Sequence, residues 1–235
     1  MKYYKILLYF LIILSLVLIG YQITITGQAI RTEKITMLKV IDGDTIDTTI
    51  GKIRLLGINT PEKKQKGYEE ALVFLKQYEG KEIIIERGRE NKDKYKRLLR
   101  YVFYNKEMIN ERILRQGLAN LYYYKEDKYT KKLKQAEEKA RTNEIGIWKK
   151  SKNASCISFV SLFYKEKKGC KNNEQLVIEN NCNIMNITLK DDANNIFKKQ
   201  LQTGKNAFNF SCIFNNDYDS LYLTDSEGML MFYRY

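Results

Sequence analysis

The chain has no histidine among its 235 residues, and this absence excludes several classes of enzyme at once. Histidine is the side chain that changes charge near neutral pH, the usual base of serine and cysteine hydrolase triads, and a common zinc ligand. His-based acid–base catalysis, His-containing triads and His-ligated zinc are therefore all excluded.

Charge is absent between Lys5 and Arg31, and Ile6 to Gly20 is almost wholly aliphatic and aromatic. This run suits either the apolar core of a signal peptide or, with the uncharged residues after it, the ~20 residues of a membrane-spanning helix. Gly27-Gln28-Ala29 is a weak cleavage site far from the apolar core, so we favour a retained signal anchor over a cleaved signal peptide. We expect a protein held in the membrane through residues 6–25 and facing the cell exterior, or a secreted one.

Cysteine is absent before residue 156. An even number of cysteines in one small module behind an export signal predicts two disulfides. Three pairings are possible, and we expect neighbours to pair, Cys156 with Cys170 and Cys182 with Cys212. A zinc site made of all four thiolates is the alternative, although no C-x-x-C spacing is present.

Acidic residues are too few to balance the basic ones. The formal charge is +13, and residues 31–150 carry +10 of it through 29 basic and 19 acidic side chains. A polyanion is attracted to such a domain by counterion release, which makes nucleic acid a natural ligand. A lysine-rich solvated surface is the alternative explanation.

Residues 31–150 alternate short β-patterned runs with helical ones. Five runs predict strands: 35–41, 45–50, 53–58, 81–86 and 98–104. Three runs with an apolar face predict helices: 68–78, 107–118 and 131–143. Five strands with interleaved and trailing helices match a mainly β OB-fold barrel, whose open face commonly binds oligonucleotides.

Residues 149–153 are polar and predict a linker to a second unit, residues 151–235. Six short β-like runs follow, 175–178, 184–189, 196–201, 207–210, 220–223 and 229–233, which predict a small all-β sandwich. Their spacing, around E-Q-L-V-I-E-N-N, I-T-L-K-D-D and D-S-L-Y-L-T-D-S-E-G, faintly resembles a lamin-tail-type immunoglobulin-like domain. Such a unit could dock to a partner in the cell envelope.

Three motifs lie in order along the predicted barrel: V-I-D-G-D-T-I-D from Val40, G-K-I-R-L-L-G-I-N-T-P-E from Gly51, and D-K-Y-K-R from Asp93. Phosphodiester hydrolysis needs a cation on the phosphoryl oxygens, a base for water, and positive charge for the developing dianion. Together the motifs resemble the thermonuclease, or staphylococcal nuclease-like, family. The resemblance implies the OB-fold and a monomeric, calcium-dependent nuclease acting on DNA, RNA or both.

The resemblance also implies a role for each residue. Asp44 aligns with a carboxylate that binds calcium in the family, and Asp42 lies near the metal. Thr60 aligns with a residue that binds the metal through its main-chain carbonyl. Calcium suits such a set because it accepts carboxylate, carbonyl and water oxygens. Glu62 aligns with the glutamate proposed as general base. Arg54 and Arg97 align with two arginines that grip the phosphate through planar forks.

Aromatic residues align with the family's substrate contacts. Tyr95 matches a tyrosine near the phosphate, and Tyr122, Tyr123 and Tyr124 lie where the family stacks an aromatic ring on a base. Stacking tolerates any base, so low sequence specificity is expected.

Two positions depart from the family pattern. Asn59 replaces a second metal-ligating aspartate; it keeps an oxygen but removes one negative charge, so calcium affinity should fall or another divalent ion be preferred. Lys96 replaces a glycine, and must adopt that glycine's backbone conformation at some cost.

Each motif alone has an ordinary explanation. The Asp42–Thr45 segment could be a turn at a strand end, and a single arginine could be a surface ion-pair partner. Their co-occurrence in order favours an exported or membrane-anchored, metal-dependent endonuclease. The alternative is a catalytically weak nucleic-acid-binding module tethered to the envelope, of which Asn59 would be the first sign.

Overall fold

A computed structural model describes residues 3–4, 9, 11–18, 32–123, 125–164, 174–193, 195–211, 213–214 and 219–235. Residues 11–18 are helical and exposed. Across the described ranges we find no helix with the length and apolar character needed to cross a membrane. Most of the predicted anchor, residues 6–25, lies outside the described residues.

The first folded unit is the five-stranded barrel that the sequence predicts. Its strands are β1 (Thr32–Asp42), β2 (Thr45–Thr48), β3 (Gly51–Leu55), β5 (Glu82–Lys92) and β6 (Leu98–Tyr104). They pair in the order β3-β2-β1-β5-β6, and a parallel pairing of β3 with β6 closes the barrel. Strand β1 can serve two neighbours because its first half pairs with β5 and its second half, which contains register shifts, pairs with β2. Bulges of this kind bend a strand around a barrel.

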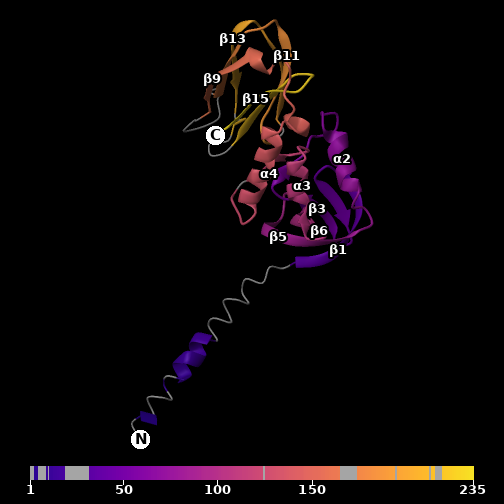
Figure 1. Cartoon of the computed structure of the whole chain (residues 1–235), viewed down its shortest axis with the longest axis vertical. Coiled ribbons are helices and arrows are strands. Elements are labelled where there is room, and N and C mark those ends of the chain that lie inside the picture. Colours follow the sequence, from indigo (N-terminus) through magenta and orange to yellow (C-terminus); the bar gives the residue numbers. More distant parts are fainter. Residues whose placement is uncertain are drawn as a thin grey trace.

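Short elements and three helices complete this unit. They are β4 (Ile58–Asn59), α2 (Tyr68–Lys76), β7 (Glu107–Met108), α3 (Ile109–Arg115), β8 (Asn120–Leu121) and α4 (Thr130–Thr142). The core contains apolar side chains of the barrel strands and of all three helices. Helices α3 and α4 lie beside each other along the barrel, as Figure 1 shows. The three helices were predicted, each within a few residues of its observed ends.

The second folded unit is a two-sheet sandwich. Its strands are β9 (Ile157–Phe163), β10 (Glu174–Asn180), β11 (Met185–Lys190), β12 (Ile196–Leu201), β13 (Gly204–Phe210), β14 (Ser220–Thr224) and β15 (Met229–Arg234). One sheet has the order β13-β10-β9 and the other β12-β11-β14-β15. Six of these strands were predicted, and β9, at the edge of its sheet, was not.

The predicted cysteine pairing is wrong where it can be tested, because Cys156 bonds to Cys182 and not to Cys170. Strands β9 and β10 are antiparallel, with Ile157 opposite Asn180. The residue before β9 and the loop after β10 therefore meet at one end of the hairpin, with Cα atoms 5.4 Å apart, a distance that suits a disulfide. Cys170 and Cys212 lie outside the described residues.

The segment predicted as a linker is packed against the sandwich. Ser151 is buried, and its N–H donates to the carbonyl of Met229 over 2.9 Å. Just before it, Trp148 ends a short 3₁₀ turn (Gly146–Trp148, η1) and packs against Tyr222 and Phe232 of the sandwich. Gly146 permits this turn, since it has φ 62° and a Cβ there would lie 2.1 Å from the Gly117 carbonyl oxygen.

Candidate functional site

The turn between β1 and β2 places Asp44 at the centre of the site. The Asp42 carboxylate accepts the N–H of Asp44 over 3.0 Å, which fixes the turn. Asp44 is 6% exposed and accepts the Thr45 hydroxyl over 3.0 Å and both the N–H and hydroxyl of Thr60 over 3.2 Å. Gly43 allows this approach, because a Cβ there would lie 2.7 Å from the Thr60 hydroxyl.

Arg54 lies on β3 against Asp44. Its Nη2 atom is 3.0 Å from an Asp44 carboxylate oxygen and 3.1 Å from Asn59 Oδ1, while Nη1 donates to the Leu55 carbonyl over 2.8 Å. The side chain is 12% exposed. Three partners therefore fix the plane of this guanidinium.

Arg97 is linked to Asp44 through Thr45. Its Nε donates to Asp93 over 2.7 Å, and its Nη1 donates to the Thr45 hydroxyl over 3.2 Å. Because that hydroxyl in turn donates to Asp44, the chain Arg97–Thr45–Asp44–Arg54 joins the two predicted arginines. The resemblance predicts that both arginines bind the phosphate, and the fold links both to Asp44, Arg54 directly and Arg97 through Thr45.

The turn that carries Arg97 is closed by Asp93, whose carboxylate accepts the N–H groups of Tyr95 and Arg97 over 2.9 Å each. Lys96 lies in this turn with φ 66°, the left-handed region that was expected where the family has glycine. Tyr95 is 67% exposed, and the Arg97 guanidinium lies 5.4 Å from its ring centre. The ring is thus exposed next to an arginine that is predicted to bind phosphate.

Glu62 follows the buried Pro61 and is exposed, so a solvent water can reach its carboxylate. Its main-chain carbonyl accepts the N–H of Gln65 over 2.8 Å, which starts the turn before α2. The Glu62 charge also acts on Lys190 of the sandwich. The predicted base therefore lies near the boundary between the two folded units.

Two acidic side chains, Asp42 and Asp44, give the site its capacity for a cation. Burial, and then the neighbouring charge of Asp44, raise the pKa of Asp42 to about 6. A hard divalent cation would relieve this repulsion, and carboxylate oxygens are its preferred ligands. Over the described ranges, however, no three Asp, Glu, His or Cys side chains form a metal-binding group. The residues thus fit a cation held by few protein ligands.

Asn59 and Thr60 use their side chains for other contacts. Asn59 is 7% exposed, and its amide bonds to Arg54 and to the sandwich; the N–H and hydroxyl of Thr60 both support Asp44. Of the tyrosines predicted to stack on a base, Tyr123 packs against the barrel core, with the Lys134 ammonium 5.1 Å from its ring centre. Tyr122 is half-buried, and Tyr124 lies outside the described residues.

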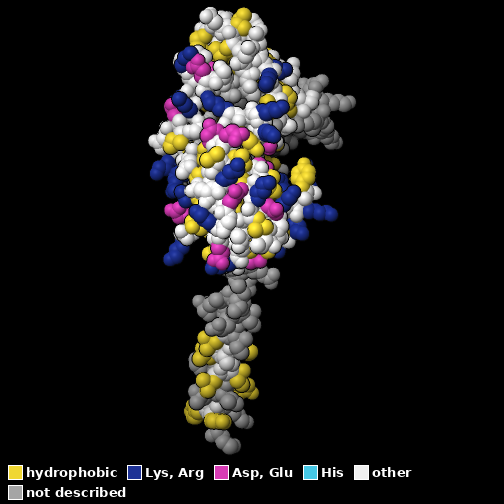
Figure 2. All heavy atoms as spheres, turned by 90° about the vertical axis from the view of Figure 1, so that its right-hand side faces the viewer, with side chains coloured by type: hydrophobic (Ala, Val, Ile, Leu, Met, Phe, Trp, Pro, Cys, Tyr) yellow, Lys and Arg dark blue, Asp and Glu magenta, His cyan; other side chains and the backbone are white. Residues whose placement is uncertain are grey.

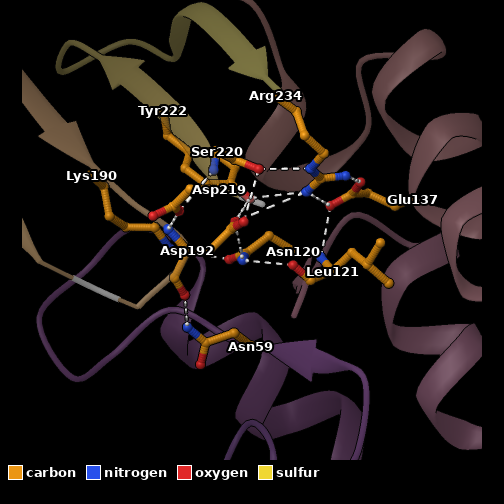
Figure 3. A network of polar contacts seen from close by, with 10 residues as sticks. All are labelled: Asn59, Asn120, Leu121, Glu137, Lys190, Asp192, Asp219, Ser220, Tyr222 and Arg234. Carbon is orange, nitrogen blue, oxygen red and sulfur yellow. Dashed lines mark hydrogen bonds and ion pairs between the residues drawn. The ribbon is translucent and has the colours of Figure 1, made fainter. Parts of the chain in front are cut away.

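The sandwich contacts the site through the turn after β11, as Figure 3 shows. Asn59 Nδ2 donates to the main-chain carbonyl of Asp192 over 3.0 Å, and Lys190 Nζ donates to Asn120 Oδ1 over 3.1 Å. Asn59 and Asn120 are opposite each other in the β4–β8 pair. Sequence reasoning missed this contact; the replacement of aspartate by Asn59 was its one signal.

A second polar link lies further from the site. The Arg234 guanidinium binds the Glu137 carboxylate through both terminal nitrogens, one at 3.1 Å. Glu137 is 1% exposed and also accepts the N–H of Leu121 over 2.7 Å. A bidentate ion pair with one buried partner restricts the orientation of the two units.

Sequence comparison finds relatives of this chain among nucleases that match the barrel described above. Residues 52–150 match the family model described as staphylococcal nuclease homologue. The thermonuclease of Staphylococcus intermedius is 34% identical over 133 residues, covering 52% of this chain and 79% of that protein. The thermonuclease of Staphylococcus hyicus is 33% identical over 124 residues, covering 48% and 73%. The SPbeta prophage-derived endonuclease YokF of Bacillus subtilis is 33% identical over 132 residues, covering 50% and 44%.

The identity and coverage of the two thermonucleases are sufficient to assign a family. The matched stretch contains Arg54, Glu62 and Arg97, and the closed barrel that bears them is the predicted one. This chain belongs to the staphylococcal nuclease family.

Proposed function

We propose that the protein is a metal-dependent endonuclease that hydrolyses phosphodiester bonds in DNA, RNA or both. The observation that carries the proposal is the chain of contacts Arg97–Thr45–Asp44–Arg54, which links two guanidinium groups through one hydroxyl and one carboxylate. The names of the relatives, thermonuclease and endonuclease, support the same activity.

In this proposal the arginines bind the scissile phosphate. A guanidinium fork offers two parallel donors to two phosphoryl oxygens, and its charge stabilises the dianion that develops as water attacks. Arg54 is held by three partners and needs little reorganisation, while Arg97, whose side chain is 26% exposed, reaches solvent. Tyr95 next to Arg97 contacts the substrate.

Glu62 acts as the base that removes a proton from the attacking water. Its exposure leaves room for that water, and its position after Pro61 sets it at the start of the turn before α2. Asp42 and Asp44 would hold the cation, with Thr60 offering its carbonyl. When bound, a calcium ion or another divalent ion would supply positive charge next to the phosphate.

The protein works outside the cytoplasm in this proposal, as an exported or membrane-anchored enzyme. Residues 11–18 support it, because they form an exposed helical run of apolar side chains, which Figure 2 shows in part. The Cys156–Cys182 disulfide supports it too, since disulfides persist in oxidising compartments. On the face drawn in Figure 2, Lys and Arg side chains are scattered over the folded body with Asp and Glu among them.

The test is cleavage of labelled single- and double-stranded DNA and RNA by the full chain with calcium, with magnesium and with a chelator. We expect divalent-dependent cutting that falls at least 100-fold in Glu62→Gln and in Arg97→Ala, the size of effect seen when one transition-state contact is removed. Glu69→Gln and Arg89→Ala change exposed side chains of the same types and serve as controls.

Each other outcome has a distinct meaning. Cutting that survives equally in Glu62→Gln and Glu69→Gln would contradict the role of Glu62 as base. Cutting in chelator would contradict metal dependence. Binding of nucleic acid without cutting under any metal would make the protein a tethered binding module instead.

A further inference from the structure

The amide of Asn59 is shared between the two folded units. Its Oδ1 accepts from Arg54 over 3.1 Å, and its Nδ2 donates to the Asp192 carbonyl over 3.0 Å. The oxygen and nitrogen of an amide point in fixed, divergent directions. A hydrogen bond to the sandwich therefore turns the oxygen of Asn59 towards Arg54.

The Asp192 carbonyl that accepts this bond belongs to a residue that is held by several hydrogen bonds within the sandwich, as Figure 3 shows. The main-chain N–H of Asp192 donates to Asp219 over 3.1 Å. Its carboxylate accepts the hydroxyl groups of Tyr222 over 2.6 Å and Ser220 over 2.9 Å. The turn after β11 is thus bonded to β14 and to the residue before it, and cannot shift without breaking buried contacts.

An aspartate could not make the same contact. It would lack the N–H donor, and its second oxygen would face the Asp192 carbonyl oxygen, with the carboxylates of Asp192 and Asp219 close behind. The contact with the sandwich therefore accounts for asparagine at this position, independently of any metal.

A second contact beside the first involves the proposed base. Lys190 donates to Asn120, the residue paired with Asn59, and its charge interacts with that of Glu62. Burial lowers the pKa of Lys190 to about 8, while the charges of Asp192, Asp191 and Glu62 act in the opposite direction. The sandwich thus borders the site on the sides of both Arg54 and Glu62.

We propose that Asn59 is a positioning residue, which docks on the Asp192 main chain of the C-terminal sandwich and thereby holds Arg54 in the orientation needed for turnover. The proposal rests on the nuclease activity proposed above. It makes the sandwich a working part of the nuclease site, in addition to any contact that it makes elsewhere.

Trp148 gives a direct measure of docking. It is the one tryptophan of the chain, is 2% exposed, and lies against Tyr222 and Phe232 of the sandwich. Its fluorescence during a urea titration reports when the sandwich separates. The variants are Asn59→Asp, which replaces the amide donor by a charged oxygen, and Arg234→Gln, which weakens docking through the ion pairs of Arg234 with Glu137 and Asp192. Lys198→Gln, an exposed change on β12, is the control.

We expect both variants to expose Trp148 at lower urea than the parent, and Lys198→Gln to match the parent. At saturating calcium and in the absence of urea, kcat should fall roughly tenfold in both variants, an effect of the size of one net hydrogen bond. KM should change less than kcat, because Arg54 acts on the transition state.

Two results would overturn the proposal. One is a parental Trp148 transition in Asn59→Asp together with higher kcat and saturation at lower calcium, which would make residue 59 a metal ligand. The other is earlier exposure of Trp148 with parental kcat, which would make the contact purely structural. A parent that cuts nothing contradicts the proposed function instead, and the Trp148 transition of Asn59→Asp still decides whether this residue docks the sandwich.

Discussion

The two arginines of the site are held in different ways. Arg97 is held by its own turn through Asp93, four residues away, and its side chain is 26% exposed. Arg54 is 12% exposed and is held by Asp44, by Leu55 and by Asn59, which bonds to a residue 133 positions further along the chain. Arg97 therefore depends on its own turn and on one contact within the barrel, to Thr45, whereas Arg54 also depends on how both folded units assemble.

Replacing each arginine by alanine should give the largest difference, and it should appear in the free energy of unfolding. Arg54→Ala leaves the buried Asp44 carboxylate without its counter-charge, next to Asp42, and should lower the free energy of unfolding by about 3 kcal/mol. Arg97→Ala leaves Asp93 with two main-chain N–H donors and should cost about 1 kcal/mol or less. Urea unfolding at pH 7 without divalent ions measures both.

Equal losses of unfolding free energy in Arg54→Ala and Arg97→Ala would show that the two arginines are held equally firmly, against this expectation. Arg54→Lys is the useful intermediate, because an ammonium keeps the charge beside Asp44 but cannot serve three partners in one plane. It should recover most of the stability and little of the cleavage rate.

Local patterns made the Arg97 side predictable. The motif D-K-Y-K-R carries its own geometry, since Asp93 closes the turn and Lys96 takes the positive φ that was expected. Alternating apolar residues likewise predicted the five barrel strands, and apolar residues at helical spacing predicted the three helices, because the barrel core is built from those faces.

Long-range pairing explains what the sequence did not predict. The Asn59–Asp192 contact, the burial of Ser151 and the Cys156–Cys182 bond all depend on which segments become neighbours after folding. Strand β9 is an edge strand with mostly exposed side chains, so its pattern lacks the buried alternation by which strands are recognised. At Asn59 the sequence alone indicates only a change in metal affinity, because the partner of its amide lies 133 residues further along the chain.

The stability contributed by Asp192, on the Arg54 side, and by Asp93, on the Arg97 side, should change with pH in opposite directions. Burial, which outweighs the attraction of Arg234, raises the pKa of Asp192 from 3.8 to about 6. The folded chain then binds this proton more tightly than the unfolded chain does. Stability from Asp192 is therefore fully present below pH 4 and is lost as pH rises through 6, by up to about 3 kcal/mol.

For Asp93, burial raises the pKa but the bonds to Arg97 outweigh it, so the net shift is downwards. Its stabilisation is present above its unfolded pKa and is lost as pH falls through its lower folded value. Between pH 4 and 7.5 the free energy of unfolding of the parent should fall relative to Asp192→Asn. Relative to Asp93→Asn, it should fall only on further acidification. Curves that are parallel to the parent for both variants would contradict these assignments.

The smallest expected effect lies in the turn on the Arg97 side, at Lys96. A residue with a side chain at φ 66° is strained, and glycine has no such penalty. Lys96→Gly should therefore raise the free energy of unfolding by up to about 1 kcal/mol, even though glycine adds entropy to the unfolded chain. Lys94→Gly removes the same charge from the same turn, but Lys94 does not have a positive φ. This change should leave the free energy of unfolding unchanged or lower it. If Lys96→Gly and Lys94→Gly shift the free energy of unfolding alike, the loss of charge and not the relief of backbone strain governs the stability of this turn. The turn that holds Arg97 would then depend on electrostatics as well as on backbone conformation.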